Sequence, residues 1–264
     1  MPDQTPASQM LRVEGLQKSY GDFVALQDIS FTASQGELVC IVGPSGCGKT
    51  TLLKCIAGLL APSSGTVELD GAPVTSPPKK MAVVFQEYGR SLMPWMTVRR
   101  NVELPLLRTT PAPERRRRVD EALEAVGLAA AHSKYPWQLS GGMQQRVAIA
   151  RALAYDPEVL IMDEPFAAVD AQTRADLEDL VRDIWARFGV TVLFVTHDID
   201  ESVYLGQRVI VLSMSPTYVQ EDLVIDLPEE RDQIGTRALP RFTELRTHVY
   251  EQIQRAKRGA TPAA

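Results

Sequence analysis

The sequence has few of the features that mark secreted or membrane-spanning proteins. It contains three cysteines, Cys40, Cys47 and Cys55, whose spacing matches neither a zinc site nor a disulfide framework. We therefore expect free thiols in a reducing cytosol. No apolar run approaches the roughly 20 residues needed to cross a bilayer, and the first residues, "MPDQTPASQM", lack the pattern of a secretory signal. If the protein works at a membrane, we expect another chain to hold it there.

An excess of basic residues is also missing. The net charge is −5 and the isoelectric point is near 5.4, so the composition does not favour electrostatic binding to nucleic acid. The one arginine-rich run, "ERRRRVDEALEAVG", carries acids as well, and we interpret it as the solvated face of a helix. With 264 residues, 45% of them hydrophobic, the chain can bury a substantial core in one or two domains.

The hydrophobic pattern predicts an α/β fold. Residues 11–33 read as two antiparallel strands with a turn at Gly21-Asp22. Apolar strands then alternate with helices, which favours a mostly parallel sheet covered on both faces. The expected elements are the strands "ELVCIVG", "GTVELDG", "KKMAVVFQ", "EVLIMDEP" and "VTVLFVTHD", and the helices 50–60 and 171–187.

One stretch departs from this alternation. Helical patterns dominate residues 87–157, which predicts an inserted α-helical subdomain. We therefore expect a domain over residues 11–225 with an N-terminal antiparallel β subdomain. A polar tail, residues 226–264, should contain a helix over 243–257.

"GPSGCGKTT" follows the strand "ELVCIV" and opens a helix, which is the context of a phosphate-binding P-loop. Glycines let several backbone N–H groups converge on one point, and the helix N-terminus adds partial positive charge. Lys49 would neutralise the β- and γ-phosphates, and the Thr50 hydroxyl would ligate Mg²⁺. The alternative is a glycine-rich turn without a ligand. The predicted nucleotide-binding residues are Gly43, Pro44, Ser45, Gly46, Cys47, Gly48, Lys49, Thr50 and Thr51.

Two acidic residues end the later strand in "VLIMDE". Asp163 would hold Mg²⁺, and Glu164 would act as the general base that activates the attacking water. The alternative is an acidic pair that caps the following segment. Together with the P-loop, the pair indicates hydrolysis of a nucleoside triphosphate.

"LSGGMQQR" provides a second anion site, because a hydroxyl and open amides stand at a helix N-terminus. Ser140 could instead be an ordinary N-cap. Since the P-loop already binds the γ-phosphate, a second cradle is useful if it serves a nucleotide on another copy of the chain.

At this point the chain resembles the ATP-binding subunits of ABC transporters over residues 11–213. The resemblance rests on the P-loop, "VFQ", "LSGGMQQR", "VLIMDEP", "FAAVD" and "FVTHD", in this order. It implies that Tyr20 stacks on adenine, which is worth about 1–3 kcal/mol, although Tyr20 could also be a strand-end residue at the rim of the core. The resemblance also implies that Gln86 contacts Mg²⁺ and the attacking water and that His197 contacts the γ-phosphate. It implies that Ser140, Gly141 and Gly142 bind the γ-phosphate held by the opposite subunit, and that Asp170 lies at the dimer interface. A capping role is the alternative for His197.

The resemblance implies an ATP-dependent homodimer with two ATP molecules between its subunits. Two uses stay open: an import subunit that docks on a membrane permease, and a soluble ATPase that acts on nucleic acid or ribosomes. The single domain and the acidic composition favour the importer without nucleic-acid binding.

Residues 87–106, the "VYLGQRVIVLS" segment and the tail resemble the nitrate/sulfonate/taurine importers. This implies a periplasmic or lipid-anchored solute-binding protein and a peripheral location at the cytoplasmic membrane face. Departures such as "MSPTYVQED" leave the solute open. Trp95 is the expected permease contact, with a place in the core as its alternative.

Overall fold

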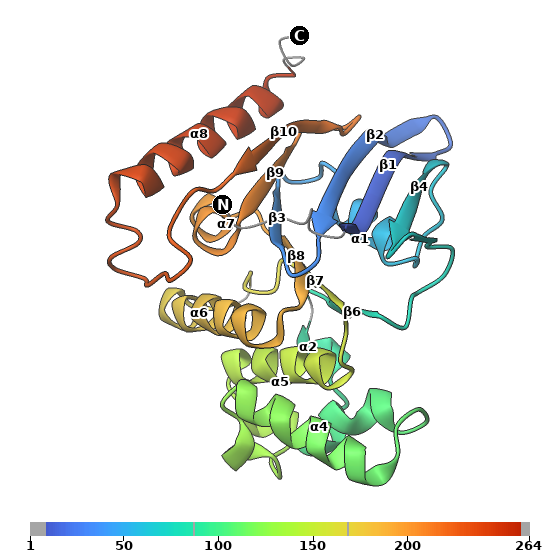
Figure 1. The fold of residues 1–264 in the computed structure, drawn as a ribbon, viewed down its shortest axis with the longest axis vertical. Helices are drawn as coiled ribbons and strands as arrows, with labels where there is room; N and C mark the ends of the chain where they lie inside the picture. The colour runs from blue at the N-terminus through green and yellow to red at the C-terminus, as the bar shows by residue number, and fades with distance from the viewer. Residues whose placement is uncertain (1–8, 87, 168, 260–264) are drawn as a thin grey trace, which may run out of the picture. The chain divides into compact units, whose positions relative to one another are not determined.

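The computed structural model describes residues 9–86, 88–167 and 169–259. The chain divides into two compact units, one made of residues 1–78 and 189–264 and the other of residues 79–188 (Figure 1). The second unit extends beyond the expected helical subdomain, residues 87–157, because it also includes two strands and a long helix. Among the described residues, none of the helices has both the length and the apolar character needed to cross a bilayer.

The first unit begins with an antiparallel sheet of order β2-β1-β4-β5. Its hairpin pairs Tyr20 with Phe23 across a turn in which Gly21 has φ 58°. Alternating burial along both hairpin strands places one face in the core. The strands are β1 (Gln9–Tyr20), β2 (Phe23–Ser34), β4 (Ser64–Leu69) and β5 (Ala72–Pro73). The expected antiparallel β subdomain is therefore present.

The remaining strands of this unit are aligned in the order β10-β9-β3-β8. β3 pairs in parallel with β8 and β9, and every residue of β3 and β8 is buried. This burial explains their continuous apolar sequences. The bounds are β3 (Leu38–Val42), β8 (Thr191–Val195), β9 (Arg208–Leu212) and β10 (Val219–Val224). β10 was not predicted, because "VQEDLV" is a polar strand that pairs antiparallel with β9.

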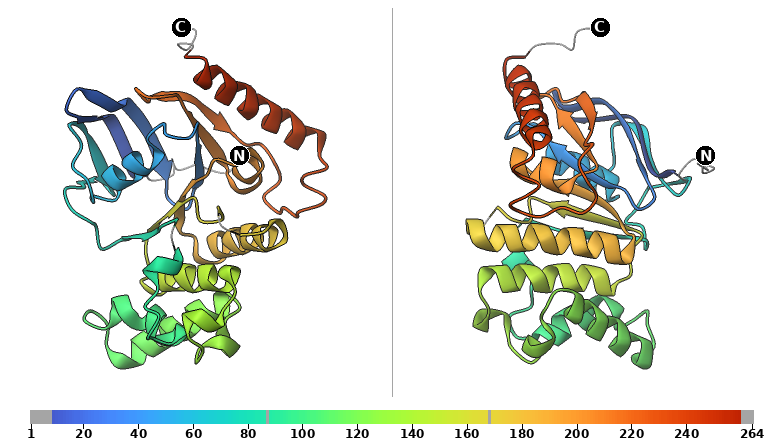
Figure 2. Two further views of the ribbon diagram at one scale, coloured as in Figure 1. Left: turned by 180° about the vertical axis from the view of Figure 1, so that it is seen from behind. Right: turned by 60° about the vertical axis from the view of Figure 1, so that its left-hand side comes forward.

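Within the described part of the same unit, three segments form α-helices. They are α1 (Lys49–Ile56), α7 (Ile199–Leu205) and α8 (Pro240–Lys257). The predicted helix over 50–60 is too long, because α1 ends at Ile56 and Gly58 just beyond it adopts φ 67°, a left-handed conformation that commonly ends a helix. The tail helix starts at Pro240, before the expected residue 243, since proline fits the first helical turn. α8 packs against α7, and the two helices lie side by side in both views of Figure 2.

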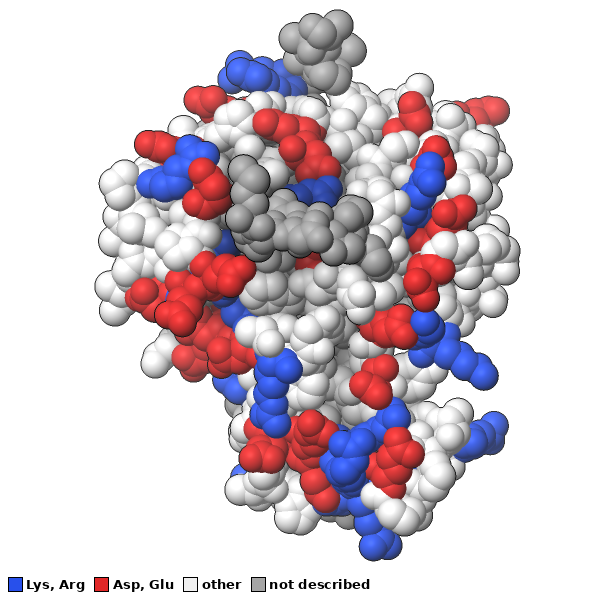
Figure 3. Space-filling model, viewed as in Figure 1, with Lys and Arg blue, Asp and Glu red and all other residues white. Residues whose placement is uncertain are grey.

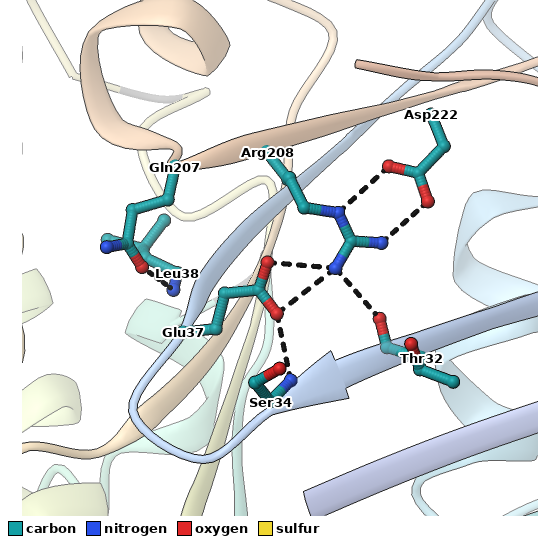
Figure 4. Close-up of polar contacts among 7 residues, drawn as sticks. All are labelled: Thr32, Ser34, Glu37, Leu38, Gln207, Arg208 and Asp222. Carbon is teal, nitrogen blue, oxygen red and sulfur yellow. Dashed lines mark hydrogen bonds and ion pairs between the residues drawn. The ribbon is translucent and has the colours of Figure 1, made fainter. Parts of the chain in front are cut away.

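Arg208 ties the edges of the two sheets of this unit together (Figure 4). Its guanidinium binds both carboxylate oxygens of Asp222 on β10 at 2.9 and 2.6 Å, and those of Glu37 at 2.8 and 3.1 Å. It also donates to the carbonyl of Thr32 on β2 at 3.2 Å. The hydrogen bonds that Arg208 donates to the Asp222 carboxylate are the largest cause that raises the pKa of Arg208.

The second unit combines a parallel strand pair with helices. β6 (Met81–Val84) runs parallel to β7 (Val159–Asp163), and Met81 pairs with Val159. Its helices are α2 (Tyr88–Ser91), α3 (Val98–Glu103), α4 (Ala112–Ala125), α5 (Gly141–Ala154) and α6 (Ala171–Phe188). The prediction that helices dominate residues 87–157 is confirmed for the described part of this segment.

The arginine-rich run lies on α4 and pairs with acids. Arg118 binds Glu114 at 2.6 Å, Arg117 binds Glu121 at 3.1 Å and Arg115 binds Glu103 at 2.7 Å. Figure 3 shows basic and acidic side chains interspersed on the face in view. The interpretation of this run as a solvated helix face is therefore confirmed.

Candidate nucleotide-binding site

Lys49 closes the loop that connects β3 to α1. Its side chain is buried, with 6% exposed, and its ammonium donates to the carbonyls of Gly43 at 3.0 Å and Pro44 at 3.3 Å. A lysine is seldom buried to this extent without polar partners. The loop carbonyls therefore hold the positive charge inside the loop, next to the first residues of α1.

Glycines give this loop its shape. Gly46 and Gly48 adopt φ 78° and 98°, a conformation that disfavours side chains, and Gly48 is the N-cap of α1. A Cβ at Gly43 would lie 3.0 Å from the Cys47 sulfur, so the loop is closely packed there. The Cys47 carbonyl accepts a hydrogen bond from the Thr217 hydroxyl.

The start of α1 suits an anion. Gly48 supplies no side-chain cap, and the first turn contains no acidic residue. The leading N–H groups of a helix need partners from outside the helix, and their dipoles favour negative charge. Ser45, Gly46 and Thr50 are exposed, Thr51 is half-buried, and Pro44 and Cys47 are buried. The loop thus fits a phosphate group, and Thr50 offers a hydroxyl oxygen to a cation held by that phosphate.

The described residues contain no cluster of three His, Cys, Asp or Glu side chains that could hold a metal ion. Mg²⁺ commonly binds through one or two protein groups together with substrate phosphates and water. A hydroxyl at Thr50 and a carboxylate at Asp163 are ligands of the type that this mode of binding requires.

Tyr20 stands at the end of β1 with 49% of its surface exposed. The ammonium of Lys18 lies 5.4 Å from the centre of the Tyr20 ring. The ring is therefore available to a planar ligand, and a cation lies close to it. This position is compatible with the alternative of a strand-end residue at the rim of the core, and the stacking role stays a proposal.

His197 follows β8 and is exposed. The cap of α7 is Asp198, whose side chain accepts from the Glu201 amide at 3.2 Å, so His197 is not the capping residue. The preceding Thr196 hydroxyl donates to the buried Glu201 carboxylate at 2.5 Å and accepts from the Asp198 amide at 2.9 Å. These bonds fix the backbone on either side of His197.

In the second unit, the ends of β6 and β7 bring Gln86 and Glu164 together. The Gln86 amide donates to a Glu164 carboxylate oxygen at 3.4 Å. Asp163, the last residue of β7, is 5% exposed. Glu164 itself has φ 44°, a left-handed conformation that a non-glycine residue adopts at a cost.

The beginning of α5 also matches an anion site. Ser140 is its N-cap, and the Ser140 hydroxyl accepts from the Met143 amide at 3.3 Å. The ordinary capping interpretation is thus correct as geometry, and one amide of the first turn is satisfied by it. Ser140 and Gly141 are exposed, and the first turn has no acidic residue.

Thr173 on α6 links two of the predicted site residues. A Cβ at Gly142 would lie 2.4 Å from the Thr173 methyl carbon, so this position has no room for a side chain. Thr173 also donates to the Asp170 carboxylate, from its amide at 3.0 Å and its hydroxyl at 2.7 Å. The backbone hydrogen bond is the largest cause that lowers the pKa of Asp170. Thr173 was not predicted from the sequence, although its spacing from Asp170 is typical of a helix N-cap.

The predicted site residues are divided between the two compact units of the chain. The P-loop, Tyr20 and His197 belong to the first unit. The second unit contains Gln86, Asp163, Glu164, Asp170 and the segment 140–142.

The comparisons with known proteins agree with the motifs. The family model described as "ABC transporter" matches residues 26–167. The nitrate import ATP-binding protein NrtC of Synechococcus elongatus is 44% identical over 243 residues, or 90% of this chain, but the match spans only 37% of that relative. The aliphatic sulfonates import ATP-binding protein SsuB of Bacillus licheniformis is 44% identical over 229 residues, or 87% of either chain.

A solved structure has the same fold. It is described as the dimeric structure of a post-hydrolysis state of an ATP-binding cassette bound to ADP and Pi. That chain is 35% identical to this one, with a TM-score of 0.71 over 82% of this chain and 99% of the other.

Proposed function

This chain belongs to the ABC transporter family, and on that premise we propose that it hydrolyses ATP to drive import of a small solute through a separate permease. The observation that carries the proposal is the P-loop, in which a buried lysine and an uncapped, acid-free helix start converge. The relatives named for nitrate and sulfonate import favour a small anion as the solute.

The residues of each unit have distinct roles in this proposal. Lys49 would exchange its loop carbonyls for phosphate oxygens, and the first amides of α1 would donate to the same group. Thr50, Asp163 and Gln86 would hold Mg²⁺, which neutralises charge on the phosphates. His197 would donate to the γ-phosphate, and Tyr20 would stack on the base.

Glu164 would accept the proton of the attacking water. Its contact with the Gln86 amide at 3.4 Å orients the carboxylate without neutralising its negative charge. An amide donates a hydrogen bond without transferring its proton, which is compatible with a role of Glu164 as the base. Through this contact, Gln86 would couple Glu164 to the segment after Gln86, which includes the proposed permease contact.

The segment 140–142 would serve ATP bound to a second copy, which makes an ATP-dependent homodimer with two composite sites. ATP that binds the closed dimer more tightly than the open state shifts the population towards closure. Hydrolysis removes the bridging γ-phosphate and lets the dimer open.

Trp95 would contact the permease at the cytoplasmic face of the membrane. It is 70% exposed, so the alternative that it belongs to the core is wrong. The Asn101 side chain holds the loop beneath it through hydrogen bonds with Met93, Met96 and Thr97 at 2.7–3.1 Å. An exposed tryptophan on a loop held by such hydrogen bonds is a suitable anchor for a protein partner. A solute-binding protein outside the membrane would deliver the solute to the permease.

A mixing experiment tests the composite site. Lys49→Ala should weaken ATP binding, because a charge-assisted phosphate contact is worth about 1.5–3 kcal/mol. Ser140→Arg should leave that binding intact but block the partner's γ-phosphate. Each variant alone should lack ATPase activity, and their mixture should regain part of it through one undamaged site per heterodimer.

If the two sites are obligately coupled, trapping of one ATP per heterodimer replaces turnover as the measurement. Full activity of either single variant would contradict the composite site. Co-purification of the wild-type protein with ribosomes or DNA, and with no membrane protein, would contradict the importer proposal.

A further inference from the structure

Tyr135 and Trp137 form an exposed aromatic pair, with their ring centroids 6.0 Å apart and their planes 13° from parallel. Trp137 is 71% exposed and Tyr135 is 37% exposed. Single exposed aromatics are ordinary, but a stacked pair concentrates apolar surface in one place. Neither the motifs nor the proposed chemistry uses these two residues.

The backbone under the pair is held from several sides. The Tyr135 amide donates to the Gln138 side chain at 2.8 Å, and the Gln138 amide donates to the Tyr135 carbonyl at 2.9 Å. The carbonyl of Lys134, just before the pair, accepts from the Val98 amide at 2.8 Å. A surface whose backbone is fixed in this way loses little conformational entropy when a partner covers it.

The aromatic pair is also connected to α5, the helix that starts with the segment 140–142. Gln144 on α5 donates to the Pro136 carbonyl, between the two aromatics, at 3.0 Å. Only two residues, Gln138 and Leu139, separate Trp137 from Ser140, which limits the separation of the Trp137 and Ser140 Cα atoms to about 10–11 Å. ATP that is held by a second copy of the chain and bound at the start of α5 would therefore bring that copy close to the Trp137 indole.

We propose that the Tyr135–Trp137 pair is part of the homodimer interface and that Trp137 anchors the second copy beside its nucleotide. This inference rests on the proposed function, in which the segment 140–142 binds ATP held by that copy. Tryptophan and tyrosine are enriched among the residues that dominate interface energetics. The pair extends the interface beyond the phosphates with an apolar contact.

The test uses the full chain carrying Glu164→Gln, so that bound ATP is not consumed. We measure the protein concentration at half-maximal dimerisation in saturating ATP for three proteins: this parent and its Trp137→Ala and Trp95→Ala derivatives. Loss of an anchor residue should raise that concentration about 30-fold for Trp137→Ala. Trp95→Ala is the matched control, because it removes an equally exposed indole from another loop and should dimerise like the parent.

Two further measurements separate an interface role from damage to the fold. The melting temperature without nucleotide should be unchanged by Trp137→Ala, and Trp137→Phe should restore part of the dimerisation. In a Trp95→Phe/Trp185→Phe background, the emission of Trp137 should shift to the blue when ATP drives dimer formation, because the indole leaves water.

This inference would be overturned, and the proposed function would stand, if Trp137→Ala dimerised at the same protein concentration as the parent. The same conclusion would follow if the emission of Trp137 did not change when ATP is added. Loss of permease binding with unchanged dimerisation would likewise assign the pair to the permease and overturn the proposal. A parent protein that stays monomeric in ATP would instead overturn the proposed function itself.

Discussion

The backbone of Glu164 allows stability and catalysis to be separated by substitution. This residue has φ 44°, and Pro165 after it further restricts its backbone away from the right-handed helical region. A residue with a Cβ loses roughly 1–2 kcal/mol in the left-handed conformation, which glycine avoids. Glycine in turn stabilises the unfolded chain by about 0.4–1 kcal/mol relative to alanine. We therefore expect Glu164→Gly to be more stable than Glu164→Ala by about 1 kcal/mol.

The assay compares these variants with Glu164→Gln. For a chain of this size, about 1 kcal/mol corresponds to roughly 2–4 °C in melting temperature, measured without nucleotide. Loss of the proton acceptor should lower ATP turnover in all three variants by at least about 100-fold, with ATP binding retained. An alanine variant as stable as the glycine variant would refute the argument from backbone strain. Rapid turnover by Glu164→Gln would refute the role of Glu164 as the base.

Substitutions of Arg208, Trp95 and Asn101 test further contacts of the fold and the proposed docking surface. Arg208→Ala leaves the carboxylates of Glu37 and Asp222 without their cation. After allowance for partial exposure, we expect the free energy of unfolding, measured with denaturant, to fall by about 2–3 kcal/mol. The exposed Arg241→Ala is the control and should change this free energy little; equal effects would contradict the structural role assigned to Arg208. Trp95→Ala should abolish co-purification with the permease at a nearly unchanged melting temperature, whereas Asn101→Ala should also lower stability by about 1–3 kcal/mol through unsatisfied loop groups. A large fall in melting temperature for Trp95→Ala would contradict the docking role.

The sequence predicted the elements whose patterns are local. The apolar run of β3 and the glycines after it define a buried strand, a loop and a helix within fourteen residues, Leu38–Thr51. The family assignment is confirmed, since several such local motifs occur in one order. β10 escaped prediction because its polar residues serve an edge strand, whose side chains are partly exposed.

Contacts between distant residues could not be predicted in the same way. Gln86 and Glu164 meet because β6 and β7 pair in parallel, and a strand register is not written in either strand alone. The contact between Thr173 and Gly142 likewise depends on how α5 packs against α6. Local motifs identify candidates for the chemistry, while the packing decides which of these residues are neighbours.

The residues proposed for function share a physical property that a motif does not state. Glu164 has an unfavourable φ, Lys49 is a buried cation, and Trp137 is an exposed indole; each departs from the ordinary preference of its residue type. Such departures persist only where neighbours compensate for them. The carbonyl of Gly43 does so for Lys49, and Gln138 fixes the backbone that carries Trp137. Because the cost falls on folding and the benefit on a ligand, substitutions at these positions should affect stability less than ligand binding.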